Sequence, residues 1–592
     1  MQTSQPSAEE KINLLARHLE HLNARVALLE ARLGQTATTV APLLSQQPEP
    51  EDDSKLSDEV INWASKASLF QRLATLCFLL VIALSIRTVT ENELIPMLAG
   101  SALGIFYAAV LMVAGWYLYR RRNLMAPVSS ATGAVLMALI VVETHTRFQS
   151  LPLIPAYLTL MATGMGMAFI SRQLSVFLPV SIGTLCMCLA GAAIDYPEPF
   201  FPYLSMILLT ANVLGCYAAT LKRCSWLRWI VLIVSLGMIQ LWGVRLGFAL
   251  FQQKQPSMAL APEWFLPVVG IFALTFTGIA LTGIIRSGTE RPSRFDCTLP
   301  TVSAASLYLI AHYVVGAFKL SLPALGTTGL GMALLHVSVV YWLTEHRRSG
   351  ATGTNSLMSA IAVLLALSLP DIAGSTILPL PFLAGAAFAM TILARRWESG
   401  GVRFTSYLLQ TYCALALTTT AINVQPGRPA IVAAVIASVL AVVGWLHYRW
   451  SRNHRTPEAS IFFSRFDRHD LAAVSLVLSS LAGAFIALRS VLGQSLAQFT
   501  GNTVHAFNCG QSVIINVAAL GLGLYATQSR NRELRNVAIL VLVAGAFKVF
   551  LHDLLHARGV PLVVSVFTFG VAAAVQSIIL SRWSRRETVT SA

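Results

Sequence analysis

The residues of this chain best suited to chemistry lie close together near its end, between Lys548 and His556. Lys548, His552, Asp553 and His556 end a long apolar run that begins at Leu534. An ammonium, a carboxylate and two imidazoles can hold an anionic group or exchange protons, because histidine titrates near neutral pH. Ionisable side chains inside a membrane span are costly and usually face protein or water. The run therefore predicts a polar site near the end of a span.

The spacing of these residues allows two interpretations. On an α-helix, Lys548, His552 and His556 share one face, because each lies four residues from the next. Lys548 and Asp553 are five residues apart, which places them about 140° apart around the axis, so they would not form a simple i,i+4 pair. The group is either a functional site with titratable histidines, or a set of interfacial side chains. In the second case Lys548 reaches the headgroups and Asp553 caps the helix.

A second candidate group ends another expected span, where Glu143 and Arg147 stand four residues apart. We expect Lys548 to meet a polar partner, either Asp553 or an acid at this end such as Glu143, because a lone charge in a span costs about 2.5–3.5 kcal/mol on insertion scales. We find no HExxH or P-loop motif, and the 8 cysteines include no CxxC pair. No catalytic residue, cofactor or metal is therefore expected. The candidate intramembrane polar cluster is Lys548, His552, Asp553, His556, Glu143 and Arg147.

The elements that must position these residues are transmembrane helices. Of 592 residues, 55% are hydrophobic and only 12% are charged, whereas soluble domains carry about 25% charged residues. The mean hydropathy of +0.65 indicates that lipid surrounds most of the chain. The fold class expected is an all-α integral membrane protein with about eighteen spans. Their approximate limits are 70–87, 95–119, 125–143, 151–170, 174–193, 200–221, 226–248, 264–285, 299–317, 321–343, 355–370, 377–394, 403–422, 430–448, 470–489, 508–528, 535–553 and 560–581.

The distribution of basic residues predicts the orientation of these spans. With a cytoplasmic N-terminus and alternating crossings, the inner loops and the tail hold 26 Lys and Arg residues, against 8 in the outer turns. Cytoplasmic loops carry such an excess of basic residues, so both termini are expected in the cytoplasm. The formal charge of +15 is spread in pairs and triplets between apolar runs. This pattern argues against nucleic acid as a partner.

The expected spans pair into helical hairpins, because prolines stand at or near the start of most inward helices. Proline suits the first turn of a helix, where its missing N–H costs nothing. The repeated hairpin pattern has two explanations. Either one hairpin was duplicated, or each hairpin acquired its proline and basic residues independently because all of them cross the same membrane interface. The prolines are Pro96, Pro152, Pro202, Pro267, Pro323, Pro379, Pro429 and Pro561.

The N-terminal residues predict a short soluble element. Between residues 9 and 33, apolar side chains recur at alternating spacings of three and four, from Ile12 to Leu33. This a/d pattern predicts a cytoplasmic coiled-coil helix over 1–33 that self-associates or lies on its own protein. Residues 34–69 form an acidic linker and an interfacial segment. The transmembrane domain covers 70–586, and residues 587–592 form a cytoplasmic tail.

Three stretches of the chain resemble a known family. They are the N-terminal coiled coil with its acidic linker, the first four spans with IALSIRTVTENELIP, and the C-terminal LRNVAILVLVAGAFKVFLHDL. Together they are similar to large polytopic membrane proteins of bacteria that are grouped as a domain of unknown function. The family typically shows a lysine and, five residues on, an aspartate, which correspond to Lys548 and Asp553. The resemblance implies a many-helix fold in the bacterial cytoplasmic membrane and brings no activity with it.

Two main hypotheses for function remain open. The first is a non-enzymatic scaffold that organises envelope components through membrane lipids, self-association at 9–33 or an unidentified protein partner. The second is a transporter or flippase for a lipid or amphipathic solute, which the hairpins and proline-broken runs favour. A weaker alternative is an envelope glycan or lipid enzyme. A water-filled cavity near the midplane with converging polar side chains would favour transport, and a dry, lipid-like interior would favour the scaffold.

Overall fold

The computed structural model describes most of the chain beyond its N-terminal part. The coiled coil expected at 9–33 and the linker that follows lie outside the described residues and stay predictions. Within the described residues, every regular element is a helix. These residues are 69–92, 94–123, 125–194, 196–221, 225–287, 292–346, 353–422, 431–457, 460–498 and 503–591.

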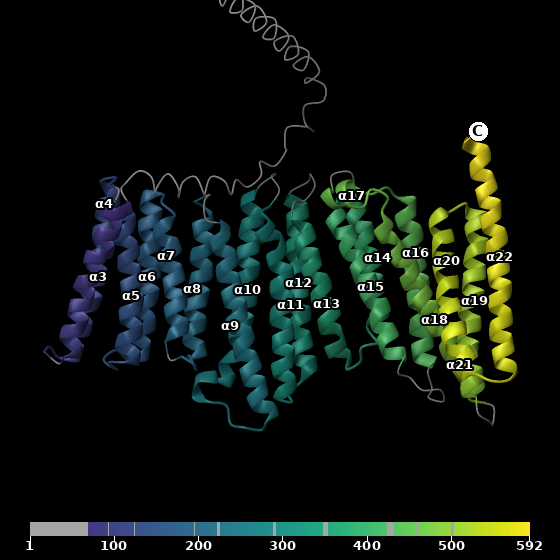
Figure 1. The fold of residues 1–592 in the computed structure, drawn as a ribbon, viewed down its shortest axis with the longest axis horizontal. Coiled ribbons are helices and arrows are strands. Elements are labelled where there is room, and N and C mark those ends of the chain that lie inside the picture. Colours follow the sequence, from purple (N-terminus) through teal and green to yellow (C-terminus); the bar gives the residue numbers. More distant parts are fainter. Residues whose placement is uncertain are drawn as a thin grey trace, which may run out of the picture. The chain divides into compact units, whose positions relative to one another are not determined.

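A long helix covers each of the expected spans. From α4 to α22, neighbouring helices lie side by side with roughly parallel axes (Figure 1). The C-terminal helix continues to Ser591, so the backbone of the expected tail at 587–591 is helical. The long helices are α3 (Leu69–Glu91), α4 (Met97–Arg120), α5 (Ala126–Thr146), α6 (Leu153–Leu174), α7 (Leu178–Ala193), α8 (Phe201–Ala219), α9 (Ser225–Phe251), α10 (Pro262–Ser287), α11 (Arg294–Ala317), α12 (Leu322–His346), α13 (Thr354–Ala373), α14 (Leu380–Arg396), α15 (Gly400–Ile422), α16 (Ile431–Asn453), α18 (Val474–Leu496), α19 (Val504–Ser529), α20 (Arg532–Phe547) and α22 (Val560–Ser591).

Five short elements complete the described part of the chain. Three of them, η1 (Met258–Leu260), α17 (Ile461–Arg465) and η2 (Leu471–Ala473), lie in the connections between long helices. The other two, η3 (Lys548–Asp553) and α21 (Leu554–His556), extend α20 without a break. The element η3 is a π-helix.

Fifteen of the described helical segments are long and apolar enough to cross a membrane. The described chain is therefore an all-α protein with membrane-spanning helices. The segment α7 is apolar but only 16 residues long, and α14 has 17 residues. The helix α15 also falls outside the fifteen, and it carries polar side chains that include Arg403 and Gln410.

Prolines begin many of the inward helices, as the sequence predicts. Pro96 and Pro152 immediately precede α4 and α6, and Pro202 is the second residue of α8. Pro267 differs, because α10 starts earlier, at Pro262, and includes Pro267 inside the helix. The positions of Pro96, Pro152 and Pro202 match the tolerance of a helix start for a residue without an N–H.

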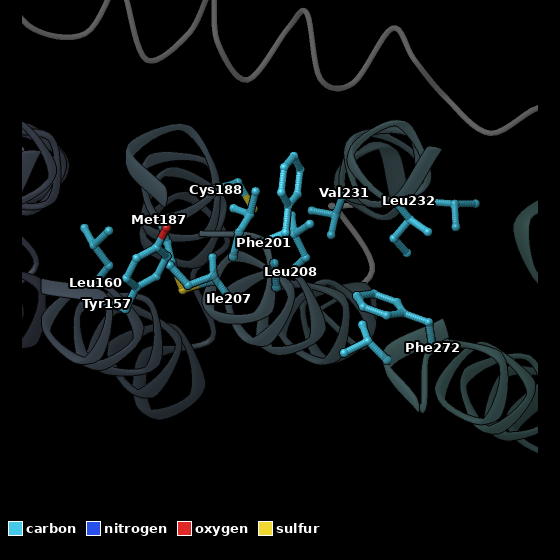
Figure 2. Packing of buried hydrophobic residues seen from close by; sticks show 14 of the residues in the cluster. Tyr157, Leu160, Met187, Cys188, Phe201, Ile207, Leu208, Val231, Leu232 and Phe272 are labelled. Carbon is cyan, nitrogen blue, oxygen red and sulfur yellow. The ribbon is translucent and has the colours of Figure 1, made fainter. Parts of the chain in front are cut away.

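Apolar side chains fill the spaces between neighbouring helices. In Figure 2, Tyr157 and Leu160 of α6 point toward Met187 of α7, and Ile207 of α8 lies beside them. This packed cluster extends from α4 to α11, and a second large cluster extends from the end of α10 to α18. Van der Waals packing of these side chains stabilises the helices against one another, because lipid tails are as apolar as the side chains and give no hydrophobic driving force between helices.

Candidate functional site

A groove of about 670 Å³ lies between α10 and α12, and α11 forms its third wall. Both helices pack against α11. Its volume is within the range of about 300–1,000 Å³ that is usual for sites of small molecules. The walls are mainly apolar: Leu266, Val269, Ala273 and Leu274 from α10, Leu307, Ala311 and Val315 from α11, and Ala324, Leu325 and Met332 from α12.

The groove ends where side chains of α10 and α12 meet. Nε2 of His336 lies 3.4 Å from Oγ1 of Thr277, and His336 is 2% exposed. The other ring nitrogen, Nδ1, donates to the carbonyl of Met332 over 2.7 Å, so Nε2 is the acceptor of the neutral ring. Thr277 and His336 thus form a polar floor below apolar walls.

A second polar feature of the groove is Tyr308 on α11. Its hydroxyl donates to Oδ2 of Asp371 on α13 over 2.7 Å, and Nδ1 of His312 lies 2.9 Å from the same oxygen. Asp371 is 8% exposed, whereas the His312 side chain is 46% exposed. Tyr308 therefore links the groove to a carboxylate that is buried behind α11.

Two glycines keep the groove open. A Cβ atom at Gly270 of α10 or at Gly331 of α12 would meet no atom within 4 Å, and both residues line the groove. Along α10, the lining extends from Leu266 to Thr277, a distance of about 16 Å at 1.5 Å per residue. That length equals about half of the 30 Å hydrocarbon core of a bilayer.

The Lys548 site is a separate arrangement at the end of α20. Asp553 is fully buried, and its Oδ2 accepts hydrogen bonds from Ser512 of α19 over 2.5 Å and Ser565 of α22 over 2.7 Å. Nζ of Lys548 lies 3.3 Å from Oδ1 of Asp553 and donates to the carbonyl of Asn508 over 2.9 Å. This network ties three helices together around one carboxylate.

The π-helix explains why Lys548 and Asp553 meet. An α-helix would separate the two side chains by about 140°, and on that basis they would not form a simple i,i+4 pair. The i→i+5 hydrogen bonding of a π-helix brings residues five apart onto one side, and such single turns recur at functional sites. The expected contact between Lys548 and Asp553 is therefore confirmed. It forms through a π-helical turn and not through the i,i+4 spacing of an α-helix.

The two histidines of this site differ from Asp553 in their surroundings. His552 is half exposed, with Nδ1 3.4 Å from Oδ1 of Asp553. His556 places its Nδ1 3.0 Å from the carbonyl of His552, and the two rings are 5.1 Å apart. The histidines therefore lie at the outside of the network, and Asp553 forms its centre.

The remaining two candidates, Glu143 and Arg147, belong to another cluster. Arg87 of α3 lies 2.8 Å from Glu143, and Arg147 lies 2.7 Å from Glu91 of α3. Arg87 also contacts Glu91 over 3.1 Å, which closes a ring of four alternating charges. The acid that pairs with Lys548 is therefore Asp553 on the same continuous helix, whereas Glu143 connects α5 to α3.

One buried ion pair was not predicted from the sequence. Arg403 of α15 lies 2.5 Å from Oδ2 of Asp470, and the two residues are each 4% exposed. Tyr407 accepts from Nε of Arg403 over 2.6 Å and donates to the same Asp470 oxygen over 3.1 Å. A signal exists in the sequence: Arg403, Ser406, Tyr407 and Gln410 recur at the spacing of one helix face.

Within the described residues, no group of three or more His, Cys, Asp or Glu side chains could hold a metal ion. Comparison with protein-family models, curated proteins and solved structures finds no match to the chain. The sites above therefore rest on their own residues.

Proposed function

We propose that the chain is a membrane protein that binds a lipid or another amphipathic molecule in the groove between α10 and α12 and moves it across the bilayer. The observation that carries this proposal is the groove itself, with apolar walls and a polar floor at Thr277 and His336. A hydrocarbon chain fits the walls, because burying apolar surface is favourable. A polar group fits the floor, where a hydrogen-bond partner is available.

The position of the groove supports transport. Its walls are three helices that each qualify as membrane-spanning, and it lies where the two large apolar clusters adjoin. Transporters often bind their substrates near the midplane, between two groups of helices. The groove thus favours the transporter hypothesis over the scaffold hypothesis, whose main argument is the coiled coil at 9–33. Lipid is the proposed partner, and no catalytic residue is assigned.

Capture of a photoactivatable phospholipid by the purified protein tests the proposal. Gly270→Leu and Gly331→Leu should each reduce labelling at least tenfold, because their side chains grow into the groove while the added Cβ meets no atom. Gly278→Leu on α10 and Gly316→Leu on α11 are matched controls, since their Cβ atoms also meet nothing and neither lines the groove. Equal labelling of all four variants would contradict binding in the groove.

Movement of lipid is measured separately. Reconstituted vesicles should translocate a fluorescent phospholipid, as read by bleaching of the outer leaflet with dithionite, and Gly331→Leu should slow the rate at least tenfold. Binding without translocation in the unaltered protein would restrict the function to lipid binding.

We also propose that all eighteen long helices cross the membrane, including α7, α14 and α15, with both termini in the cytoplasm. The support is the 26 to 8 asymmetry of basic residues, which the loss of any one crossing would spoil by exchanging the inner and outer loops after it. The bacterial inner membrane and membership of the family named above are part of the same proposal.

A cysteine at position 122 tests this topology. In a background without native cysteines, Arg122→Cys should react with an impermeant thiol reagent in inside-out vesicles and not in intact cells. Arg147→Cys, at the opposite helix end, should show the reverse. Labelling of position 122 in intact cells would overturn the orientation.

A further inference from the structure

The buried face of α15 carries polar side chains at every turn of its first half. Arg403, Ser406, Tyr407 and Gln410 follow one another at spacings of three, one and three, which place them on one side of the helix. All four are at most 4% exposed. The helix packs among α13, α14, α16 and α18, so this polar face lies inside the bundle.

Ser406 and Tyr407 connect the Arg403–Asp470 pair to a histidine one turn deeper. Oγ of Ser406 lies 2.5 Å from Oγ1 of Thr391 on α14. Nε2 of His447 on α16 lies 2.5 Å from the same Thr391 oxygen and 3.4 Å from Ser406. The rings of Tyr407 and His447 are 5.6 Å apart. Three helices thus contribute to a continuous set of polar groups.

Several atoms of this set find no hydrogen-bond partner among the described residues. They are Nδ1 of His447, Oδ1 of Asp470, and both the nitrogen and the oxygen of the Gln410 amide. Gln410 and His447 are fully buried. Either tautomer of His447 leaves Nδ1 as a donor or an acceptor that needs a partner. A buried amide without hydrogen bonds costs about 1–3 kcal/mol for each group left unpaired.

We propose that this face of α15 is a water-binding path that leads from the Arg403–Asp470 pair past His447 and ends at Gln410. Water suits the site, because it donates and accepts and can therefore serve the carboxylate oxygen, the imidazole and both ends of the amide. The path begins at the basic end of the helices, where Arg403 also donates to the carbonyls of Ser451 and His454.

The path ends where the face of α15 becomes apolar. Beyond Gln410, Cys413 and Leu417 continue the same buried face and belong to the apolar core. The result is a half-channel that holds water between the Arg403–Asp470 pair and Gln410, with the His447 ring beside it. The groove between α10 and α12 is a different site, so the two proposals stand or fall separately.

Thiol accessibility tests the path in the full-length protein in lipid vesicles. In a background without native cysteines, Ser406→Cys and Gln410→Cys should react with a small methanethiosulfonate cation at least tenfold faster than Leu417→Cys. Leu417 is the matched control, because it is fully buried on the same face of the same helix. A rate at position 410 less than tenfold above that at position 417 would overturn the proposal.

The stability of Gln410→Leu gives an independent test. If water satisfies the amide, leucine removes those hydrogen bonds, and the melting temperature should fall. If the amide is dry, leucine removes an unpaired buried group, and the melting temperature should rise. An unchanged or higher melting temperature would therefore overturn the water-binding path, whatever the state of the lipid groove.

Discussion

Asp553 and Asp470 are both buried carboxylates next to a cation, yet their surroundings differ. Every oxygen of Asp553 has a partner, from Lys548, Ser512 and Ser565. Asp470 gives one oxygen to Arg403 and Tyr407, whereas its Oδ1 has no partner among the described residues. A carboxylate whose two oxygens both accept from protein donors joins helices. A carboxylate with one oxygen that accepts from no protein donor can hold a further molecule.

The same contrast separates the two neighbourhoods. Around Asp553, the serines of α19 and α22 leave the carboxylate itself fully enclosed. One turn along α19 from Ser512, Oδ1 of Asn516 has no partner among the described residues. Around Asp470, the unpaired atoms continue along α15 to Gln410. We therefore interpret the Lys548–Asp553 pair as a structural connection and the Arg403–Asp470 pair as the start of a site. The experiments below would break or sharpen this distinction.

Removal of Asp553 should have the largest effect. Asp553→Ala leaves Lys548 without its counter-ion and two serines without their acceptor, and loss of one partner of a buried pair costs about 3–5 kcal/mol. Thermal unfolding in detergent should show a clearly lower melting temperature. Lipid capture by the remaining folded protein should be unchanged, and a selective loss of capture would instead make Asp553 part of the function.

Lys548→Met should cost less than Asp553→Ala, because Lys548 is partly exposed and an apolar residue suits a membrane span. If the pair is structural, the double variant Lys548→Met with Asp553→Asn should recover part of the loss caused by Asp553→Asn alone. The same unfolding measurement gives the coupling energy, and additive effects would show that the two residues are independent.

Arg403→Lys should destabilise the protein by about 1.5–3 kcal/mol. Lysine cannot reproduce the planar set of donors that reaches Tyr407, Asp470 and the carbonyl of Ser451, and a hydrogen bond to a charged group contributes about that amount. The measurement is again thermal unfolding. Because Arg403 lies at the start of the proposed path, the thiol reaction of Gln410→Cys should also change in this background.

The charge ring of α3 and α5 should give the smallest effect. Arg147 is 58% exposed, and exposed ion pairs contribute about 0.2–1 kcal/mol. Arg147→Met should therefore change the melting temperature little at low salt and still less at high salt, where screening weakens the remaining pairs. A large loss of stability would show that the ring fixes α3 to α5 more strongly than its exposure indicates.

The sequence by itself determines the positions of the long helices in this chain. Apolar runs of about twenty residues have one stable form in lipid, because only a helix satisfies its own backbone there. Prolines at helix starts and basic residues at alternate ends add further local signals. Each of these signals lies within one stretch of chain and needs no knowledge of its neighbours.

The contacts between helices were decided only by the tertiary structure. The groove exists because α10 and α12 flank α11 and leave space between them, and no single helix encodes that space. The Lys548–Asp553 pair needs a π-helical turn, and the apolar pattern of the sequence does not predict where such a turn occurs. The polar face of α15 can be recognised in the sequence. Which of its atoms lack a hydrogen-bond partner depends on how α14, α16 and α18 pack around it, because the partners of a buried side chain come from neighbouring helices.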